Sequence, residues 1–254
     1  EHLDYDLALK QAQDLGFAET DPTLDVGGFD PKYKLTIIAA HAFGLFLNPD
    51  TIFNLGIQNL SKHDIQYARE KDYKIKLVPH VSKVNEATVT LFVMPQFVKR
   101  SHPLYNVDNE YNGVIVEAAF SEKQFFSGKG AGGYPTGSAV LSDISALTYG
   151  YKYEYKKHLQ HIEVNSTNNI EVEVYLRYTD KEILKKLPFE SISEKFTAKD
   201  FKYVIGFVRL ENLLDQVETL RQSEAFLVST GNFQAITADN SETRRQAVEE
   251  MEVL

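Results

Sequence analysis

The hydrophobic pattern predicts helices at the start of the chain and strands further on. Apolar residues recur at helical spacing ahead of Gly16, namely Leu3, Leu7, Ala8, Ala12 and Leu15. A polar, acidic loop over 17–29 follows. A second helix is predicted to begin with Asp30 as N-cap and Pro31 in the first turn, and to end at Gly44. Its buried stripe is predicted to consist of Leu35, Ile38, Ala39 and Ala42.

The next stretch is rich in β-branched and aromatic residues. A short helix is predicted over 59–69, because Ser61 to Asp64 has the form of a capping box. Strands are predicted in four runs, which are 73–81, 84–97 with a break at Pro95, 113–120 and 124–127. A glycine cluster then leads into a predicted helix over 136–147, and a charged, aromatic segment over 151–157 is predicted to be a linker.

From Asn169 the alternation restarts. The predicted strands and helices are, in order, 170–178, 181–187, 191–196, 201–210, 213–221 and 225–228. This βαββαβ order is that of a compact split β-α-β unit. An acidic tail over 239–254 is predicted to be helical. The fold class is therefore α/β (α+β), with a mixed sheet in residues 1–160 and a second α+β domain in residues 161–254.

Composition argues against nucleic-acid binding, membrane spanning and cysteine chemistry. The chain has 254 residues with 36 acidic and 27 basic side chains, so its formal net charge is −9. A negative surface argues against nucleic acid as a partner. No run reaches the roughly 20 apolar residues of a membrane span, and the absence of cysteine removes disulfides, thiol catalysis and cysteine-based zinc sites. We therefore expect a cytoplasmic protein without nucleic-acid or membrane partners.

Charged side chains are densest between Glu19 and Lys34. This stretch holds four carboxylates and two ammonium groups, which belong to Glu19, Asp21, Asp25, Asp30, Lys32 and Lys34. A cluster of carboxylates suits a substrate that carries an ammonium group. Asp30 and Lys34 have i,i+4 spacing, so they can share one helix face, where an enclosed lysine can exchange a proton with a substrate hydroxyl. The alternative is a surface ion pair worth a few tenths of a kcal/mol, with Asp30 as a helix cap, Lys32 solvated and Asp21 as a turn former.

A second cluster, of glycines, has the residue spacing of a dinucleotide-binding motif but lacks the sequence context of that motif. Gly128-x-Gly130-x-x-Gly133 has the required spacing, but the acidic residue expected about 20 positions later in a βαβ unit is missing. A glycine turn that enters a helix still presents N–H groups to an anion such as phosphate. The alternative is a tight turn that needs positive φ. The seven histidines are scattered, and no metal site is predicted.

These two clusters, in this order, resemble the homoserine dehydrogenase family over about residues 1–150. The matching motifs are Gly16-Phe17-Ala18-Glu19-Thr20-Asp21-Pro22, Asp25-Val26-x-Gly28-x-Asp30-x-x-x-Lys34-Leu35, His102-Pro103-Leu104 and Gly130-Ala131-Gly132-x-x-Pro135-Thr136-x-Ser138-Ala139-Val140-x-x-Asp143. The resemblance implies an oxidoreductase that interconverts L-homoserine and L-aspartate-4-semialdehyde with NADP or NAD, in the pathway to threonine, isoleucine and methionine.

The resemblance also implies roles for individual residues. Lys34 resembles the proton donor to the aldehyde oxygen, and Glu19 and Asp30 resemble substrate-binding residues, with Asp25 in support. Gly130 and Gly132 are implied to lie beside the cofactor. These roles require Lys34 and its acidic neighbours to gather around a small substrate, away from bulk solvent.

The family carries a nucleotide-binding domain ahead of this region, and this chain does not contain it. We therefore expect a truncated chain that is inactive alone and that forms a homodimer. The C-terminal domain resembles an ACT domain, which implies threonine as a possible effector. Thr179-Asp180-Lys181-Glu182 replaces the Asp-x-Pro-Gly motif of such domains, so a purely structural role is an equal alternative. Two other hypotheses are a non-catalytic amino-acid-sensing or assembly module and the dehydrogenase half of a kinase fusion. The roughly 100 residues after Asp143 argue against the fusion.

Overall fold

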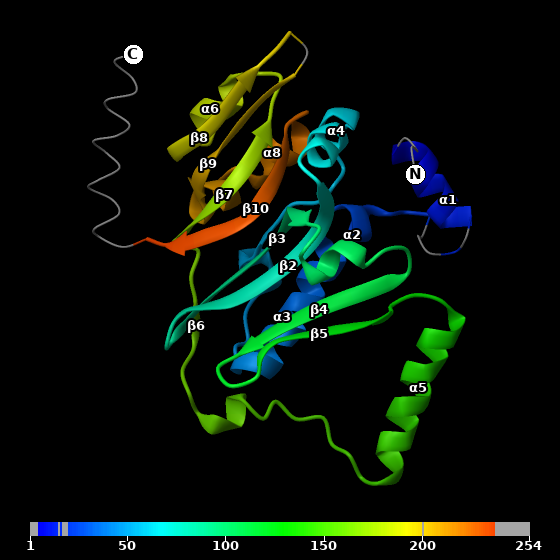
Figure 1. The fold of residues 1–254 in the computed structure, drawn as a ribbon. Helices are drawn as coiled ribbons and strands as arrows, with labels where there is room; N and C mark the ends of the chain where they lie inside the picture. Colours follow the sequence, from blue (N-terminus) through cyan, green and yellow to red (C-terminus); the bar gives the residue numbers. More distant parts are fainter. Residues whose placement is uncertain (1–4, 15, 17–19, 200, 237–254) are drawn as a thin grey trace.

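The computed structural model describes residues 5–14, 16, 20–199 and 201–236, which Figure 1 shows as a ribbon. Within these residues, a mixed sheet of eight strands is accompanied by a separate hairpin of two strands. The α-helices are α1 (Tyr5–Asp14), α2 (Thr23–Val26), α3 (Phe29–Phe43), α4 (Lys62–Glu70), α5 (Gly133–Thr148), α6 (Glu182–Lys186), α7 (Leu210–Asp215) and α8 (Val217–Gln222). The short 3-10 helices are η1 (Pro49–Thr51), η2 (Pro103–Asn106) and η3 (His158–Gln160). The strands are β1 (Phe53–Asn54), β2 (Tyr73–Asn85), β3 (Thr88–Lys99), β4 (Tyr111–Ala118), β5 (Glu122–Lys129), β6 (Asn165–Ser166), β7 (Ile170–Arg177), β8 (Phe189–Thr197), β9 (Lys202–Arg209) and β10 (Phe226–Ala235).

The large sheet is mixed because β3 has neighbours in both directions. β2 pairs with β3 in antiparallel orientation, whereas β1, β6 and β10 pair with it in parallel. Through the pairing of Ser229 in β10 with Gln96 in β3, the sheet continues in the order β1-β3-β10-β7-β9-β8. The predicted mixed sheet and α/β fold class are confirmed.

Residues 170–235, hereafter the C-terminal module, have the predicted βαββαβ order. Within the module the four strands pair in antiparallel orientation, and β7 lies between β10 and β9. The predicted second helix is interrupted at Gln216, so it forms the two short helices α7 and α8. The last strand is longer than predicted, because β10 continues to Ala235 through a bulge between Ser229 and Phe233.

One hydrophobic core joins the C-terminal module to the rest of the sheet. The central strand β7 is buried on both faces, as the middle strand of a covered sheet must be. Side chains from β1 and β3 belong to the same buried cluster as those from β7 and α7, and they include Phe53, Phe92, Met94, Ile170, Val172, Leu210 and Leu213. The module and the sheet of the first half are therefore packed together rather than joined by a flexible link.

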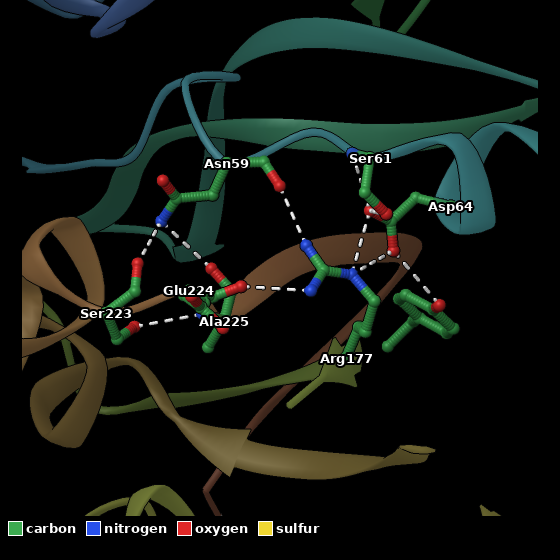
Figure 2. A network of polar contacts seen from close by, with 8 residues as sticks. Asn59, Ser61, Asp64, Arg177, Ser223, Glu224 and Ala225 are labelled. Carbon is green, nitrogen blue, oxygen red and sulfur yellow. Dashed lines mark hydrogen bonds and ion pairs between the residues drawn. The ribbon is translucent and has the colours of Figure 1, made fainter. Parts of the chain in front are cut away.

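A buried polar network spans this junction (Figure 2). The Nε of Arg177, at the end of β7, donates to the two carboxylate oxygens of Asp64 in α4 at 2.9 and 3.0 Å. The hydroxyl of Tyr175 donates to the same carboxylate at 3.1 Å. The carboxylate also accepts the N–H and hydroxyl of Ser61, which completes the predicted capping box. The other two guanidinium nitrogens donate to the backbone carbonyls of Glu224 and Asn59, so every nitrogen of this buried cation has an acceptor.

The hairpin β4–β5 and helix α5 carry many exposed apolar side chains. In Figure 1, α5 stands away from the eight-stranded sheet. Its exposed residues include Val140, Leu141, Ile144 and Leu147. Among the described helices, none has the length and apolar character needed to cross a bilayer.

The start of α3 differs from its prediction. The helix begins at Phe29, and its N-cap is Gly28 rather than Asp30. The carboxylate of Asp30 instead pairs with Lys34 one turn later. Leu35 and Ala39 are buried as predicted. Ile38 and Ala42 are exposed, whereas Lys32 and Ala40 are buried, so the buried face of α3 is rotated from the predicted stripe.

Strand boundaries were also predicted incorrectly around Pro95. The break expected there does not occur, and β3 runs from Thr88 to Lys99. On one side of β3 the recorded partner changes from β1, opposite Phe92 and Val93, to β10, opposite Gln96. Pro95 lies between these partners, where its missing N–H breaks no recorded pairing on that side. The segment 151–157 contains no helix or strand, as predicted. The acidic tail over 239–254 lies outside the described residues.

Candidate functional site

The described part of the carboxylate cluster surrounds the turn between α2 and α3. Gly27 ends α2, and Gly28 precedes α3 with a φ of 77°. This left-handed conformation favours glycine because a Cβ atom would strain it. The predicted loop over 17–29 therefore contains a short helix. Asp25 lies in α2 and Asp30 lies in the first turn of α3, on either side of the two glycines.

Asp30 and Lys34 form the predicted i,i+4 ion pair on the surface of α3. The Nζ of Lys34 lies 2.7 Å from Oδ2 of Asp30. The Lys34 side chain is 62% exposed and the Asp30 side chain is 41% exposed. The described residues therefore do not enclose the pair, contrary to the enclosed site that we expected. The ammonium group is instead accessible to a ligand that approaches from solvent.

The other predicted acidic residues have different environments. Asp21 forms a turn, because its Oδ1 accepts the N–H of Thr23 at 3.0 Å and the Thr23 hydroxyl at 2.5 Å. These hydrogen bonds hold the pKa of Asp21 below its usual value. Asp25 is exposed on α2, and its backbone carbonyl accepts the N–H of Gly28. Glu19 lies outside the described residues.

Residues 54–58 hold the α2–α3 turn from the side of the sheet. The side-chain Nδ2 of Asn54 donates to the carbonyl of Gly27 at 3.0 Å, and the N–H of Ile57 donates to the carbonyl of Val26 at 2.8 Å. Gly56 is in such close contact that a Cβ atom there would lie 1.8 Å from the Val26 carbonyl oxygen. Asn54 is almost fully buried. The turn is therefore fixed by β1 and the residues that follow it.

Lys32 is buried rather than solvated, which corrects the prediction. Lys32 is 4% exposed, and its Nζ lies 5.1 Å from the centre of the Phe29 ring. Desolvation, together with the positive charge of Arg221, lowers the pKa of Lys32, and the carboxylate of Asp50 opposes this effect. The guanidinium of Arg221, from α8, lies 5.0 Å from the same ring. The first turn of α3 therefore packs against the C-terminal module.

The glycine turn predicted to lie beside a cofactor precedes α5. Gly132 is the N-cap of α5 with a φ of 109°, which supports the tight-turn explanation. Gly130 donates its N–H to the backbone carbonyl of Glu110. The N–H groups of Ala131 and Gly132 have no backbone acceptor in the described part of the chain. These two groups suit an anionic ligand. Among the described residues, no hydrogen bond or ion pair joins this turn to Asp25, Asp30 or Lys34.

No metal centre is apparent among the residues that the structure describes. No group of three or more His, Asp or Glu side chains in them could hold an ion. His80 packs against the rings of Phe92 and Phe233, and burial lowers its pKa to about 4. It is therefore neutral near pH 7 and belongs to the packing of the sheet.

Sequence reasoning missed the residues that support the site. Asn54, Gly56 and Arg221 contact the α2–α3 turn or its first helical residue, but they come from β1, the following loop and α8. No short-range pattern marks them, because their role depends on contacts between distant parts of the chain. A two-residue strand such as β1 has too little periodicity to detect.

Comparisons with known proteins agree on one family. The family profile described as homoserine dehydrogenase matches residues 1–145. A homoserine dehydrogenase of Lactococcus lactis is 41% identical over 140 residues, and one of Neisseria gonorrhoeae is 43% identical over 136 residues. These alignments cover 55% and 54% of this chain but only 32% and 31% of the relatives. The chain thus spans about a third of the length of the curated relatives it matches.

Solved structures extend the similarity to the C-terminal module. The homoserine dehydrogenase structure from Thiobacillus denitrificans has a TM-score of 0.69 and 26% sequence identity, and the match covers 89% of this chain and 58% of that one. A putative homoserine dehydrogenase structure from Archaeoglobus fulgidus has a TM-score of 0.52 and 35% identity, and covers 58% of this chain and 44% of that one. The first match is long enough to continue well beyond residue 145, so it includes much of the C-terminal module.

Proposed function

Because this chain belongs to the homoserine dehydrogenase family, we propose that it forms the substrate-binding and catalytic part of an NADP- or NAD-dependent homoserine dehydrogenase. The reaction is the interconversion of L-homoserine and L-aspartate-4-semialdehyde, in the pathway to threonine, isoleucine and methionine. The observation that carries the proposal is the Asp30–Lys34 pair. It lies within the region that matches the family, on a helix face open to a ligand.

In this proposal Lys34 transfers the proton. During reduction its ammonium group donates a proton to the aldehyde oxygen as that oxygen gains negative charge, and in the reverse direction its amine accepts the proton from the homoserine hydroxyl. Asp30, 2.7 Å away, orients the ammonium group. A nicotinamide cofactor, when bound, supplies or accepts the hydride.

Acidic side chains are proposed to bind the substrate. The α-amino group of homoserine is a cation at neutral pH, so a carboxylate at hydrogen-bond distance binds it through a charge-assisted contact. We assign this contact to Glu19 and Asp30, with Asp25 in support. The exposure of Asp25 and Asp30 leaves their carboxylates accessible to such a ligand.

The cofactor is proposed to contact this chain at Gly130 and Gly132. The N–H groups of Ala131 and Gly132, which have no backbone acceptor among the described residues, and the positive φ of Gly132 fit close approach of an anionic phosphate. The relatives are about three times as long as the matched region, so we place the principal nucleotide-binding domain in the part of the protein that this chain does not span. On this proposal the chain alone has no turnover, and that domain covers the exposed Asp30–Lys34 face.

The remaining proposals concern organisation. We propose a division into residues 1–160, for substrate binding and dimerisation, and residues 161–254, an ACT-like domain. The order βαββαβ with β7 in the interior supports the second assignment. That domain either senses an effector such as threonine or serves assembly alone, and the protein is proposed to be a cytoplasmic homodimer.

The test is a substitution in the complete enzyme, with reduced nicotinamide followed by absorbance. Lys34→Ala is expected to lower kcat by about 10²–10⁴-fold, because general acid–base groups contribute on this scale. Lys185→Ala is the matched control, since Lys185 is also mostly exposed, at 73%, in a helical ion pair with Glu182. Both variants should melt close to the parent protein. A Lys34→Ala enzyme with a nearly unchanged rate would leave the pair as a surface ion pair.

The second hypothesis is a non-catalytic amino-acid-sensing or assembly module. It predicts that the complete protein does not reduce the nicotinamide cofactor when homoserine is added. Binding of threonine, measured by calorimetry, would then support sensing, and the absence of heat would support assembly alone. Homoserine turnover that depends on Lys34 would exclude this hypothesis.

A further inference from the structure

Arg221, in the C-terminal module, is linked to the α2–α3 turn through the buried side chain of Asn54. Its Nη2 donates to the backbone carbonyl of Asn54 at 2.9 Å and to the side-chain Oδ1 of Asn54 at 3.0 Å. The Nδ2 of the same amide donates to the carbonyl of Gly27 at 3.0 Å. A continuous path of hydrogen bonds therefore runs from α8 through β1 to the residue just before the N-cap of α3.

The guanidinium selects the orientation of the Asn54 side chain. With Oδ1 toward Arg221, the NH₂ group of the amide faces the Gly27 carbonyl and both contacts are favourable. A flipped amide would place two donors together at Arg221 and two acceptors together at Gly27. Arg221 thus favours the one orientation in which Asn54 holds the turn.

The same guanidinium also contacts the first helical residue after the turn. Its Cζ lies 5.0 Å from the centre of the Phe29 ring, and Phe29 is the residue between Gly28 and Asp30. Gly28 has positive φ, and glycine does not restrict the backbone to that conformation by itself. The contacts on Gly27 and Phe29 therefore fix the direction in which α3 leaves the turn.

Arg221 is not needed to attach the C-terminal module. The module is already joined to the first half by the shared core and by the Arg177–Asp64 network. The Nε of Arg221 is buried without a hydrogen-bond partner in the described residues. A buried donor without an acceptor is unfavourable. Nη1 pairs with Glu218 of the same helix α8, so among the described residues it is Nη2, through Asn54, and the face of the guanidinium, over Phe29, that reach the turn.

We propose that Arg221 is a positioning residue of the proposed dehydrogenase, acting through Asn54 and Phe29 to place Asp30 and Lys34. This inference rests on the proposed function and adds that the substrate site depends directly on the C-terminal module. The module therefore contributes to catalysis whether or not it binds an effector.

The experiment compares Arg221→Ala, Arg221→Lys and Asn54→Ala in the complete enzyme, with Arg209→Ala as the matched control. Arg209 is another arginine of the module, and its ion pair with Glu190 stays within the module. We expect Arg221→Ala to lower kcat with homoserine about 10- to 100-fold, as a small misplacement of catalytic groups can. The KM for the nicotinamide cofactor should not change. Arg221→Lys should restore part of the rate, and Arg209→Ala should behave like the parent enzyme.

A double-mutant cycle tests the route. If Arg221 acts through Asn54, Arg221→Ala should have a much smaller effect in an Asn54→Ala background than in the parent enzyme, and the contact with Phe29 accounts for the part that remains. An unchanged kcat in both Arg221 variants would overturn the inference, and so would effects that simply multiply in the double variant. If Arg221→Ala does not fold, the comparison of Arg221→Lys with the parent enzyme decides.

A readout without turnover separates this inference from the proposed function. Amide hydrogen exchange across 26–30 should become faster in Arg221→Ala than in Arg209→Ala, because the turn loses its support. If the parent enzyme does not oxidise homoserine, the proposed function fails. Exchange then still decides whether Arg221 holds the turn, and equal exchange in the two variants would show that it does not.

Discussion

The carboxylate of Asp64 and the guanidinium of Arg177 form a buried ion pair at 2.9 Å between α4 and β7. Asp64 is completely buried, and the Arg177 side chain is 10% exposed. The pair joins the first half of the chain to the C-terminal module at the level of the sheet (Figure 2). The same Asp64 carboxylate also accepts hydrogen bonds from Ser61 that cap α4, so one side chain links a local helix start to the packing of the two halves.

Asp64→Ala should therefore strongly destabilise the protein. The substitution leaves the Arg177 guanidinium buried without its counter-charge, which typically costs about 3–5 kcal/mol of unfolding free energy. Urea unfolding measures this loss. Glu190→Ala is the control, because its ion pair with Arg209 is partly exposed and should contribute only about 0–1 kcal/mol. Equal losses in the two variants would contradict a special role for the buried pair.

His80 should make stability depend on pH between about 4 and 6.5. Burial lowers its pKa from 6.5 to about 4, so the unfolded chain binds a proton that the folded chain refuses. Stability then falls as the pH falls through this window, by up to about 3 kcal/mol from this group. The measurement is the unfolding free energy of the parent and of His80→Phe at several pH values. The difference between the two proteins should change across the window, and a constant difference would mean that His80 does not titrate as described.

Gly56→Ala should disturb the α2–α3 turn, whereas alanine at a glycine with open space around it should not. The new Cβ would lie 1.8 Å from the carbonyl oxygen of Val26 and 2.6 Å from the Cα of Gly27, so the backbone must shift. Overpacking of this kind costs about 1–3 kcal/mol. Gly128→Ala is the control, because a Cβ added at Gly128 would have no described atom within 4 Å. Thermal unfolding and the amide exchange of 26–30 should both respond to the first substitution, and similar behaviour of the two variants would rule out the close contact.

The sequence predicted those elements whose signals are local. The capping box at Ser61 and Asp64 and the C-terminal Gly44 of α3 mark helix ends through their own side chains or backbone freedom, and both were placed correctly. The N-cap of α3 was misplaced, because both Gly28 and Asp30 are acceptable caps by composition. The choice was made by the positive φ of Gly28 and by the pairing of Asp30 with Lys34.

Burial and support of the site could not be predicted in this way. A lysine two positions from Asp30 on a helix is ordinarily solvated, but Lys32 packs on Phe29 in a region that Arg221 also contacts. That environment depends on how the C-terminal module docks, which is set by a hydrophobic core and a buried ion pair between distant segments. The i,i+4 pair of Asp30 and Lys34 was predictable because it needs only the helix that carries it.

The hairpin β4–β5 is predicted to lie in the interface of the proposed homodimer. On one face, Gly113 approaches Leu104 and Val107 around η2. Val114, paired with Phe126, and Val116 point to the opposite face of the pleat and are between 42% and 56% exposed. A two-stranded hairpin with an uncovered apolar face is marginally stable alone, so a second copy that covers this face would stabilise it.

Val116→Lys should therefore shift the complete enzyme from dimer toward monomer in sedimentation velocity runs at several protein concentrations. The introduced ammonium group would have to be buried at the interface without a partner, which strongly disfavours association. Glu117→Lys introduces a lysine at the next residue, which points to the other face of the hairpin. It removes only an exposed ion pair with Lys123, which should contribute about 0–1 kcal/mol, so it should leave the dimer intact. A dimer that survives Val116→Lys would place the interface elsewhere. Dissociation by both variants would show that charge, rather than burial of this face, controls assembly.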